Sequence, residues 1–373
     1  MGVSFKKLLN LILIIGYFHG LPSKAFPDEI EYNDLIILGK QLESSISSGN
    51  PYYFNLCFNT ESIIDSAILS NPKNAENSFA QGFIEGLKQQ FDPGNAILEL
   101  IGADGSFTFI RAYKRDGRSK LLFRLISSNG INYHEYDVGQ KDEKLVLTDA
   151  YIFTTAQTIS GTYKNIYNKY FLNLPEYRIS RADKKIQRLA AIGNSRKAYK
   201  QWLNLPENIR FSKTNQLMGI HLASKLDRET YFGAYIEFMN HFPDEPGKYF
   251  IALEGLIKQG YYHAALKAIE KLDEYIQTDP ILNVIKADIY YESGDTQNAE
   301  EHLNKLIEEM PEYETGYLNL LGLYIEENEF MKATLLLDKI ILTFNASKED
   351  LQQIVTDYTD FLQSDEFKNW MNN

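Results

Sequence analysis

The chain has 373 residues, of which 44% are hydrophobic, with 38 basic against 50 acidic residues and a net charge of -12. This hydrophobic content excludes a wholly disordered chain, and the length favours two or three domains. The single cysteine, Cys57, excludes an internal disulfide, an iron–sulfur cluster and a cysteine-based zinc site, so we expect it to act as a small buried apolar residue.

Residues 1–25 have the pattern of a cleavable secretory signal peptide. Lys6 and Lys7 precede an apolar run over 8–18, and small residues end at Ala25. The run is too short for a transmembrane helix, which needs ~20 residues. The sequence therefore predicts cleavage near Ala25 and a protein exported to the periplasm or the cell exterior, with no transmembrane segment after cleavage.

The region 26–172 changes from a helical to a strand pattern. Apolar spacing predicts helices over 28–48, 61–69 and 76–91. Short apolar runs follow, namely AILELIG, SFTFIRAYK, SKLLFRLI, INYHEYDV and LVLTDAYIF. Turn signals such as Asp116-Gly117 and Asn129-Gly130 separate these runs and favour hairpins. We therefore predict an α+β domain, with helices on one face of a curved antiparallel meander of four or five strands.

This order of elements is topologically similar to the cystatin-like and NTF2-like α+β domains. Such domains include enzymes, ligand binders and dimerisation modules, so the resemblance implies a fold and no particular activity. Polar residues in adjacent predicted strands are candidates for a ligand pocket: Arg111, Arg124, His134 and Asp149. In that hypothesis His134 acts as acid or base and Asp149 orients it. The alternative, which we favour, is a solvated sheet face with cross-strand ion pairs.

A 34-residue period begins at about residue 246. Small residues recur at Ala265, Ala299 and Ala333, and turn-forming residues recur at Gly260, Gly294 and Asn328. Such a period is typical of stacked helical hairpins, each too small to bury its apolar face alone. The glycines and the asparagine are suited to a left-handed turn between the two helices of each hairpin.

The segment 290–311 (YYESGDTQNAEEHLNKLIEEMP) resembles a tetratricopeptide repeat of a secreted bacterial protein. Units at 255–272 and 318–340 match less closely, and in the first of these Pro280 falls three residues late. Weaker units precede them at 182–206 and 215–243, the latter with Tyr231 in place of the small residue. We therefore predict an all-α solenoid over 173–345, most regular over 246–345, followed by a capping helix and tail over 346–373.

The resemblance implies that a peptide or a partner protein binds the concave face of the solenoid. Projected onto this sequence, the face comprises Phe250, Glu254, Ile257, Lys258, Asp288, Tyr291, Glu292, Leu318, Ile325 and Glu326. Apolar and acidic groups together suit a peptide that carries Lys or Arg. The segment 164–228 has a net charge of +10 and the segment 280–373 a net charge of -13, a polarity that also favours head-to-tail self-association.

The common hydrolase, zinc-protease and nucleotide-binding motifs are absent from the sequence, and the histidines lack metal-ligand spacing. We therefore expect no cofactor and no metal. Nucleic acid is not an expected partner, because the chain is acidic overall and predicted to be exported. The leading hypothesis is a non-enzymatic interaction scaffold. The alternative is small-ligand binding, or less favourably catalysis, in the N-terminal domain, with the repeats as an assembly module.

Overall fold

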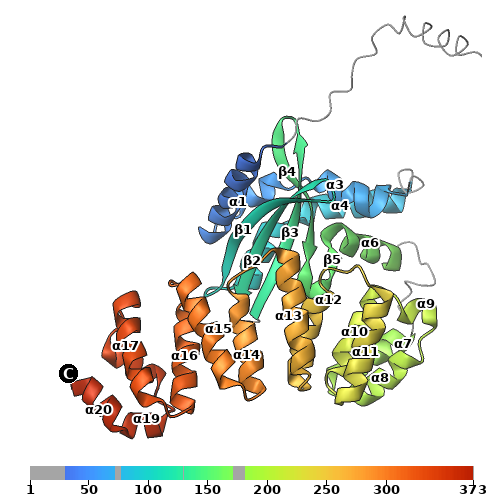
Figure 1. Cartoon of the computed structure of the whole chain (residues 1–373). Coiled ribbons are helices and arrows are strands. Elements are labelled where there is room, and N and C mark those ends of the chain that lie inside the picture. Colours follow the sequence, from blue (N-terminus) through green and yellow to red (C-terminus); the bar gives the residue numbers. More distant parts are fainter. Residues whose placement is uncertain (1–29, 72–76, 129, 171–180, 373) are drawn as a thin grey trace, which may run out of the picture.

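The computed structural model describes residues 30–71, 77–128, 130–170 and 181–372 (Figure 1). The predicted signal peptide lies outside the described residues. A layered α+β region comes first, and a mostly helical region follows it. Within the described residues, no helix combines the length and the apolar character that crossing a membrane requires.

The first region contains an antiparallel five-stranded sheet whose strands follow their chain order. The strands are β1 (Ser106–Arg115), β2 (Arg118–Ser127), β3 (Gly130–Lys141), β4 (Lys144–Ile152) and β5 (Gln157–Thr158). The helices around it are α1 (Tyr32–Ser47), α2 (Tyr52–Cys57), α3 (Thr60–Ile64) with the π-helix Asp65–Leu69, α4 (Ser78–Gln90), α5 (Pro93–Ile101) and α6 (Ile159–Tyr170). The predicted meander is thus present as four long strands and one very short one.

The run AILELIG, predicted as a strand, forms most of helix α5 instead. Pro93 occupies the first turn, where its missing N–H costs nothing, and the Asp92 side chain accepts a hydrogen bond from the Asn95 N–H at 3.1 Å. Ile97 and Ile101 then fall on one buried face of the helix. The prediction was wrong because the Asp-Pro start signal is stronger than the local apolar run.

One face of the sheet packs against the N-terminal helices. Its aromatic centre is Phe107, Phe123 and Tyr136, with the rings of Phe107 and Phe123 stacked at a centroid distance of 4.4 Å. Leu42 from α1 and Cys57 from α2 belong to the same core. Cys57 is unpaired and 7% exposed, so the expectation of a small buried apolar residue is confirmed.

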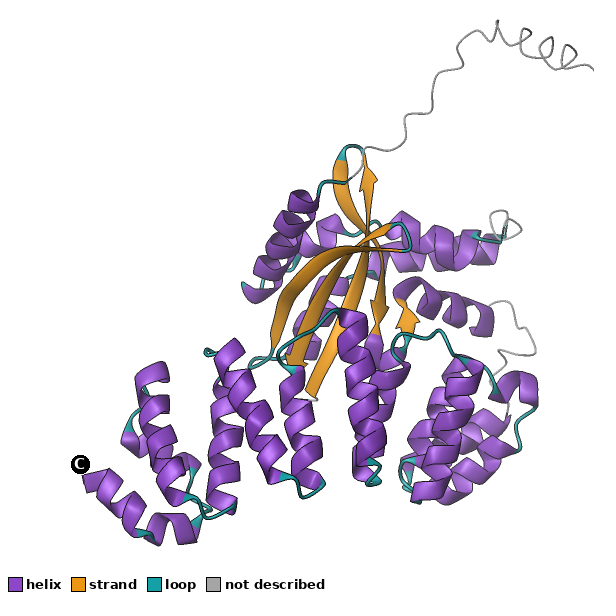
Figure 2. Cartoon of the chain, in the orientation of Figure 1, coloured by secondary structure: helices purple, strands orange, loops and turns teal. Residues whose placement is uncertain are grey.

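The second region is an arc of antiparallel helical hairpins (Figure 2). The hairpins are α7 (Arg181–Ala191) with α8 (Ser195–Leu203), α10 (Lys213–Ala223) with α11 (Arg228–His241), α12 (Lys248–Lys258) with α13 (Tyr262–Ile276), α14 (Leu282–Glu292) with α15 (Thr296–Glu309), and α16 (Glu314–Glu326) with α17 (Phe330–Phe344). The short helices are α9 (Glu207–Arg210), α18 (Lys348–Ile354), α19 (Thr359–Gln363) and α20 (Asp365–Asn372).

The turns inside the three regular hairpins have the predicted left-handed backbone. Gly260, Gly294 and Asn328 have φ values of 71°, 82° and 59°. The small residues at Ala265, Ala299 and Ala333 are buried, at 0%, 1% and 0% exposure, where neighbouring helices approach closely. The periodic sequence signal therefore corresponds to repeated close packing in this region.

Tyr231 occupies the position where the later hairpins have a small residue. Its side chain is fully buried, and its hydroxyl donates to the Ala252 carbonyl at 2.8 Å. The space comes from Gly255 on the next helix, because a Cβ there would lie 2.1 Å from the Tyr231 ring. The large and small partners have therefore exchanged helices, which explains why this unit departs from the repeat pattern.

The second face of the sheet packs against the hairpins. Tyr113, Leu122, Tyr133 and Phe153 share one hydrophobic core with residues of α10 to α14, and Figure 1 shows the sheet seated on the ends of α12, α13 and α14. The predicted cross-strand ion pairs exist: Glu135 contacts both Arg115 and Lys120, at 2.9 Å each. The solvated face is the incorrect part of that interpretation, because the helical region covers it.

Candidate functional site

A buried polar network joins the sheet to the loop between α13 and α14. Arg124 Nη1 lies 2.6 Å from Asp279 Oδ1, and the Tyr133 hydroxyl donates to Asp279 Oδ2 at 2.9 Å. The side chains of Arg124 and Asp279 are 7% and 1% exposed. Burial and the Asp279 charge raise the pKa of Tyr133 well above its usual value. Arg124, predicted as a pocket residue, therefore links the sheet to this loop through its Nη1 group.

The same loop also receives Arg111, whose guanidinium donates to the carbonyl oxygens of Gln277 and Thr278. Both loop residues have positive φ, at 61° and 77°. These residues lie directly before Asp279 and Pro280, and Pro280 falls three residues late relative to the repeat pattern. The irregular spacing in the sequence thus marks the segment that contacts the sheet.

A second polar contact lies at the loop between α11 and α12. The Glu245 carboxylate, in a residue 9% exposed, accepts from the Tyr151 hydroxyl of β4 and pairs with Lys213 of α10. Lys213 also donates to the Ala156 carbonyl at 2.9 Å. The sheet is therefore fixed to successive loops along one edge of the hairpin array.

The structure does not bring the four predicted pocket residues together. Arg111 and Arg124 lie on the face of the sheet that contacts the hairpins. His134 pairs in register with Phe123 and lies on the other face, which packs against the N-terminal helices. Asp149 accepts from the Ser160 N–H at 3.1 Å, the Ser160 hydroxyl and the Ala150 N–H. Asp149 therefore does not orient His134.

His134 lines a cavity of about 660 Å³ between the sheet, α5 and α6. Most of the lining is apolar, with Phe91, Ile97, Leu125, Ile131, Ile152, Ile159 and Ile166 among it. Burial lowers the pKa of His134 to about 3, so its imidazole is neutral at physiological pH. Asn132 and Tyr136 contact His134 on either side and also line the cavity.

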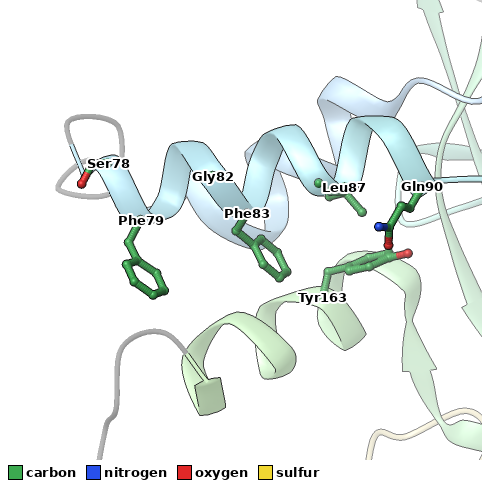
Figure 3. A pocket seen from close by; sticks show the side chains of 8 residues that line it. Ser78, Phe79, Gly82, Phe83, Leu87, Gln90 and Tyr163 are labelled. Carbon is green, nitrogen blue, oxygen red and sulfur yellow. The ribbon is translucent and has the colours of Figure 1, made fainter.

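A second hollow of about 560 Å³ adjoins this cavity, between α4 and α6 (Figure 3). Phe79 and Phe83 extend from α4 towards α6, and Gln90 lies beside Tyr163. Gln90 and Tyr163 line both hollows, so the two spaces meet at these side chains.

The predicted partner-binding residues divide by exposure. Glu254, Lys258, Asp288, Tyr291, Glu292 and Glu326 are exposed, and Ile257 is half-buried. Phe250 is half-buried against the sheet, with its ring 6.2 Å from that of Tyr133. Leu318 packs partly, and Ile325 almost completely, into the core of the last hairpins, which removes Ile325 from the exposed surface.

Four of the exposed residues form what we call the acidic row: Glu254 on α12, Asp288 and Glu292 on α14, and Glu326 on α16. They fall at two repeat positions, 34 residues apart within each pair: Glu254 with Asp288, and Glu292 with Glu326. The Tyr291 hydroxyl donates to Glu326 from the neighbouring helix. No ion pair within the described part of the chain involves any of the four. Desolvation, and then the Glu292 charge, raise the pKa of Asp288 to about 6.

Three residues of these sites were not predicted. Asn132 and Tyr136 flank His134 at two-residue spacing in INYHEYDV, a polar alternation that places all three on one face of a strand. Asp279 lies directly before the late Pro280. No group of three or more His, Cys, Asp or Glu side chains in the described ranges is arranged to hold a metal ion.

No protein-family model matches the chain, and no curated protein matches it significantly. Among solved structures, the chain is similar to MamA 41-end from Desulfovibrio magneticus RS-1, at 13% identity and a TM-score of 0.35, covering 45% of this chain and 95% of that one. The MamA RS-1 ArsTM double mutant gives the same identity and TM-score, with coverages of 46% and 99%. A likeness of this size carries no argument about function. The architecture itself defines the class, an α+β layer fixed to an array of helical hairpins.

Proposed function

We propose that the protein is an exported, non-enzymatic interaction scaffold that holds a Lys- or Arg-bearing segment of a partner protein against the acidic row. The observation that carries this proposal is the set of carboxylates without ion-pair partners. Asp288 and Glu292 are separated by four residues on α14, a spacing at which like charges destabilise a helix by ~0.2–0.5 kcal/mol. A cationic partner removes that repulsion.

The surroundings of the row also favour a polypeptide partner. Tyr291 is 41% exposed and presents an aromatic ring between the carboxylates of two helices. Tyrosine is enriched at binding interfaces because it combines an apolar ring with a polar tip. The sheet is fixed to the inter-hairpin loops, so it braces the array and leaves the exposed side chains of the row accessible.

Charge reversal of the row should abolish partner binding. With the variant Asp288→Lys and Glu292→Lys, we expect a peptide array of Lys- and Arg-containing sequences to lose at least tenfold in bound signal, because repulsion replaces attraction. The matched control is Glu301→Lys with Glu308→Lys, which reverses two exposed charges on α15. Equal signal from wild type and the α14 variant would contradict the proposal.

A second copy of the chain is an alternative cationic partner, since the segment 164–228 carries a net charge of +10. Sedimentation of the wild-type protein at about 0.05 and 0.5 M salt distinguishes this case, because screening weakens charge-driven association. If the protein is monomeric at both salt concentrations, the cationic partner of the acidic row is a different protein.

Asp288 makes the site dependent on pH. Its folded pKa of about 6 lies above the ordinary value of 3.8. Between these values the folded chain binds the extra proton, so the group's contribution to stability is present below pH ~4 and is lost as the pH rises through about 6. Basic peptides should accordingly bind more tightly at pH 7 than at pH 5, as the carboxylate forms.

The variant Asp288→Asn tests both effects together. At pH 7 it should bind basic peptides more weakly and show a free energy of unfolding higher by at most ~1 kcal/mol, because solvent screens the exposed group. Urea unfolding and peptide titration at pH 5 and pH 7 measure the two quantities. A variant that keeps the full pH dependence of binding would show that another group is responsible.

A further inference from the structure

The floor of the 660 Å³ cavity is a chain of polar groups on β3. Asn132, His134 and Tyr136 are 9%, 6% and 1% exposed. Asn132 Nδ2 lies 3.2 Å from His134 Nε2, and His134 Nδ1 lies 3.1 Å from the Tyr136 hydroxyl. Other polar side chains line the cavity, among them Gln90, Ser127 and Thr162, but the three on β3 are buried and joined in one hydrogen-bond chain. A ligand that reaches the floor must therefore match their donors and acceptors.

The backbone fixes the direction of this hydrogen-bond chain. Asn132 Oδ1 accepts from the N–H groups of Tyr133, at 2.8 Å, and Thr154, at 3.2 Å, so the amide nitrogen must face His134. His134 Nε2 is then an acceptor, and its single proton resides on Nδ1. The Nδ1–H donates to the Tyr136 oxygen, and the Tyr136 O–H is the last donor of the chain.

The chain therefore contains more donors than acceptors. Among the described residues, no acceptor is within reach of the Tyr136 O–H hydrogen, and the second amide hydrogen of Asn132 has none either. A buried donor without an acceptor costs ~1–3 kcal/mol. Such a floor is complementary to a ligand that contributes an acceptor.

The walls exclude a charged ligand. No Lys or Arg is among the described residues that line the cavity. Its one acid, Asp92, lies at the start of α5, where its carboxylate accepts from Asn55 and Asn95. An anion would lack a counter-charge there, and a cation would have only this occupied carboxylate.

We propose that this cavity binds an uncharged, mainly hydrocarbon molecule with one carbonyl-type acceptor, which accepts the hydrogen bond of Tyr136. The volume of about 660 Å³ lies within the range of small-molecule sites, ~300–1,000 Å³. The entrance is at α5, where Ala96 and Leu100 are exposed and line the cavity. The adjoining hollow beside Gln90 and Tyr163 gives a longer hydrocarbon chain room to continue (Figure 3).

The test uses Nile red, an uncharged dye with a carbonyl acceptor, and its displacement by 2-undecanone or by decanoate. We expect the purified protein to enhance Nile red fluorescence and 2-undecanone to displace the dye at lower concentration than decanoate. Tyr136→Phe keeps the ring in its aromatic core but removes the donor, so it should weaken 2-undecanone about fivefold. Preferential displacement by decanoate, or an unchanged 2-undecanone affinity in Tyr136→Phe, would overturn the proposal.

A second pair of variants keeps the test independent of core packing. Ala96→Trp places an indole at the entrance and should abolish the displaceable dye signal, while the melting temperature stays unchanged because position 96 is exposed. Glu99→Trp adds the same side chain to α5 at an exposed position that does not line the cavity, and it should bind like the wild type. Equal loss in both variants, or in neither, would contradict this site. The acidic row is untouched, so the outcome is independent of the proposed scaffold function.

Discussion

Replacing Asp279 by alanine should lower the free energy of unfolding by about 3–5 kcal/mol, the range for breaking a buried ion pair from one side. The variant leaves the Arg124 guanidinium buried beside Tyr133, without its carboxylate, at the contact between sheet and hairpins. Urea unfolding followed by both circular dichroism and tyrosine fluorescence measures the loss. A single shifted transition is expected, because the two regions share one core.

The matched control for Asp279 is Glu274→Ala on the neighbouring helix. Glu274 pairs with Lys271 at 2.7 Å, but these side chains are 71% and 57% exposed. Exposed pairs contribute ~0–1 kcal/mol, so the control should change stability little. An equally small effect for Asp279→Ala would mean that the network does not hold the regions together.

Adding one methyl group at Gly255 should destabilise the protein by about 1–3 kcal/mol, the usual cost of overpacking. The new Cβ would lie 2.1 Å from the Tyr231 ring, which is fully buried and hydrogen-bonded to Ala252. The ring therefore has little freedom to move. Thermal and urea unfolding of Gly255→Ala measure the effect.

An alanine at Gly233, on the adjacent helix α11, should raise the stability of the protein and not lower it. A Cβ there meets nothing within 4 Å, so Gly233→Ala gains helix propensity without a clash. We expect it to stabilise the protein by ~0.5–1 kcal/mol. If both alanine variants shifted stability in the same direction, the exchange of large and small residues between α11 and α12 would not govern their packing.

The hairpins were predictable because their information is local and repeated. The period of Ala265, Ala299 and Ala333 identifies close helix contacts, and Gly260 and Gly294 identify the turns. The exchange of Tyr231 with Gly255 was not predictable from one unit alone, because each residue makes sense only against its neighbour on the other helix.

The covered second face of the sheet was missed although a signal for it exists. The run Leu121-Leu122-Phe123 is apolar without alternation, which is typical of a strand buried on both faces. The charged residues between such positions, including Arg124, favoured a solvated face. Their partners, such as Asp279, lie more than a hundred residues away, and a local pattern carries no information about that distance.

The candidate binding surfaces were also predictable only where the sequence pattern is local and repeated. Repeat spacing placed Glu254 with Asp288, and Glu292 with Glu326, at equivalent positions, and all four are exposed. The cavity beside His134 depends on α5 and α6 approaching the face of β3 that carries His134. Strand alternation predicts that His134 and Glu135 point to opposite faces, but it does not predict which helices cover each face.

Site-specific photo-crosslinking can detect whether the acidic row binds a basic segment of a partner. A photoreactive amino acid in place of Tyr291 lies within the row, and the same residue in place of exposed Glu270 on α13 lies outside it. We predict that position 291 crosslinks to partner peptides with Lys or Arg beside the attachment point, and that about 0.5 M salt or Asp288→Lys with Glu292→Lys suppresses the product. Equal crosslinking at 291 and 270, or attachment to segments without basic residues, would contradict binding of a basic segment at the acidic row.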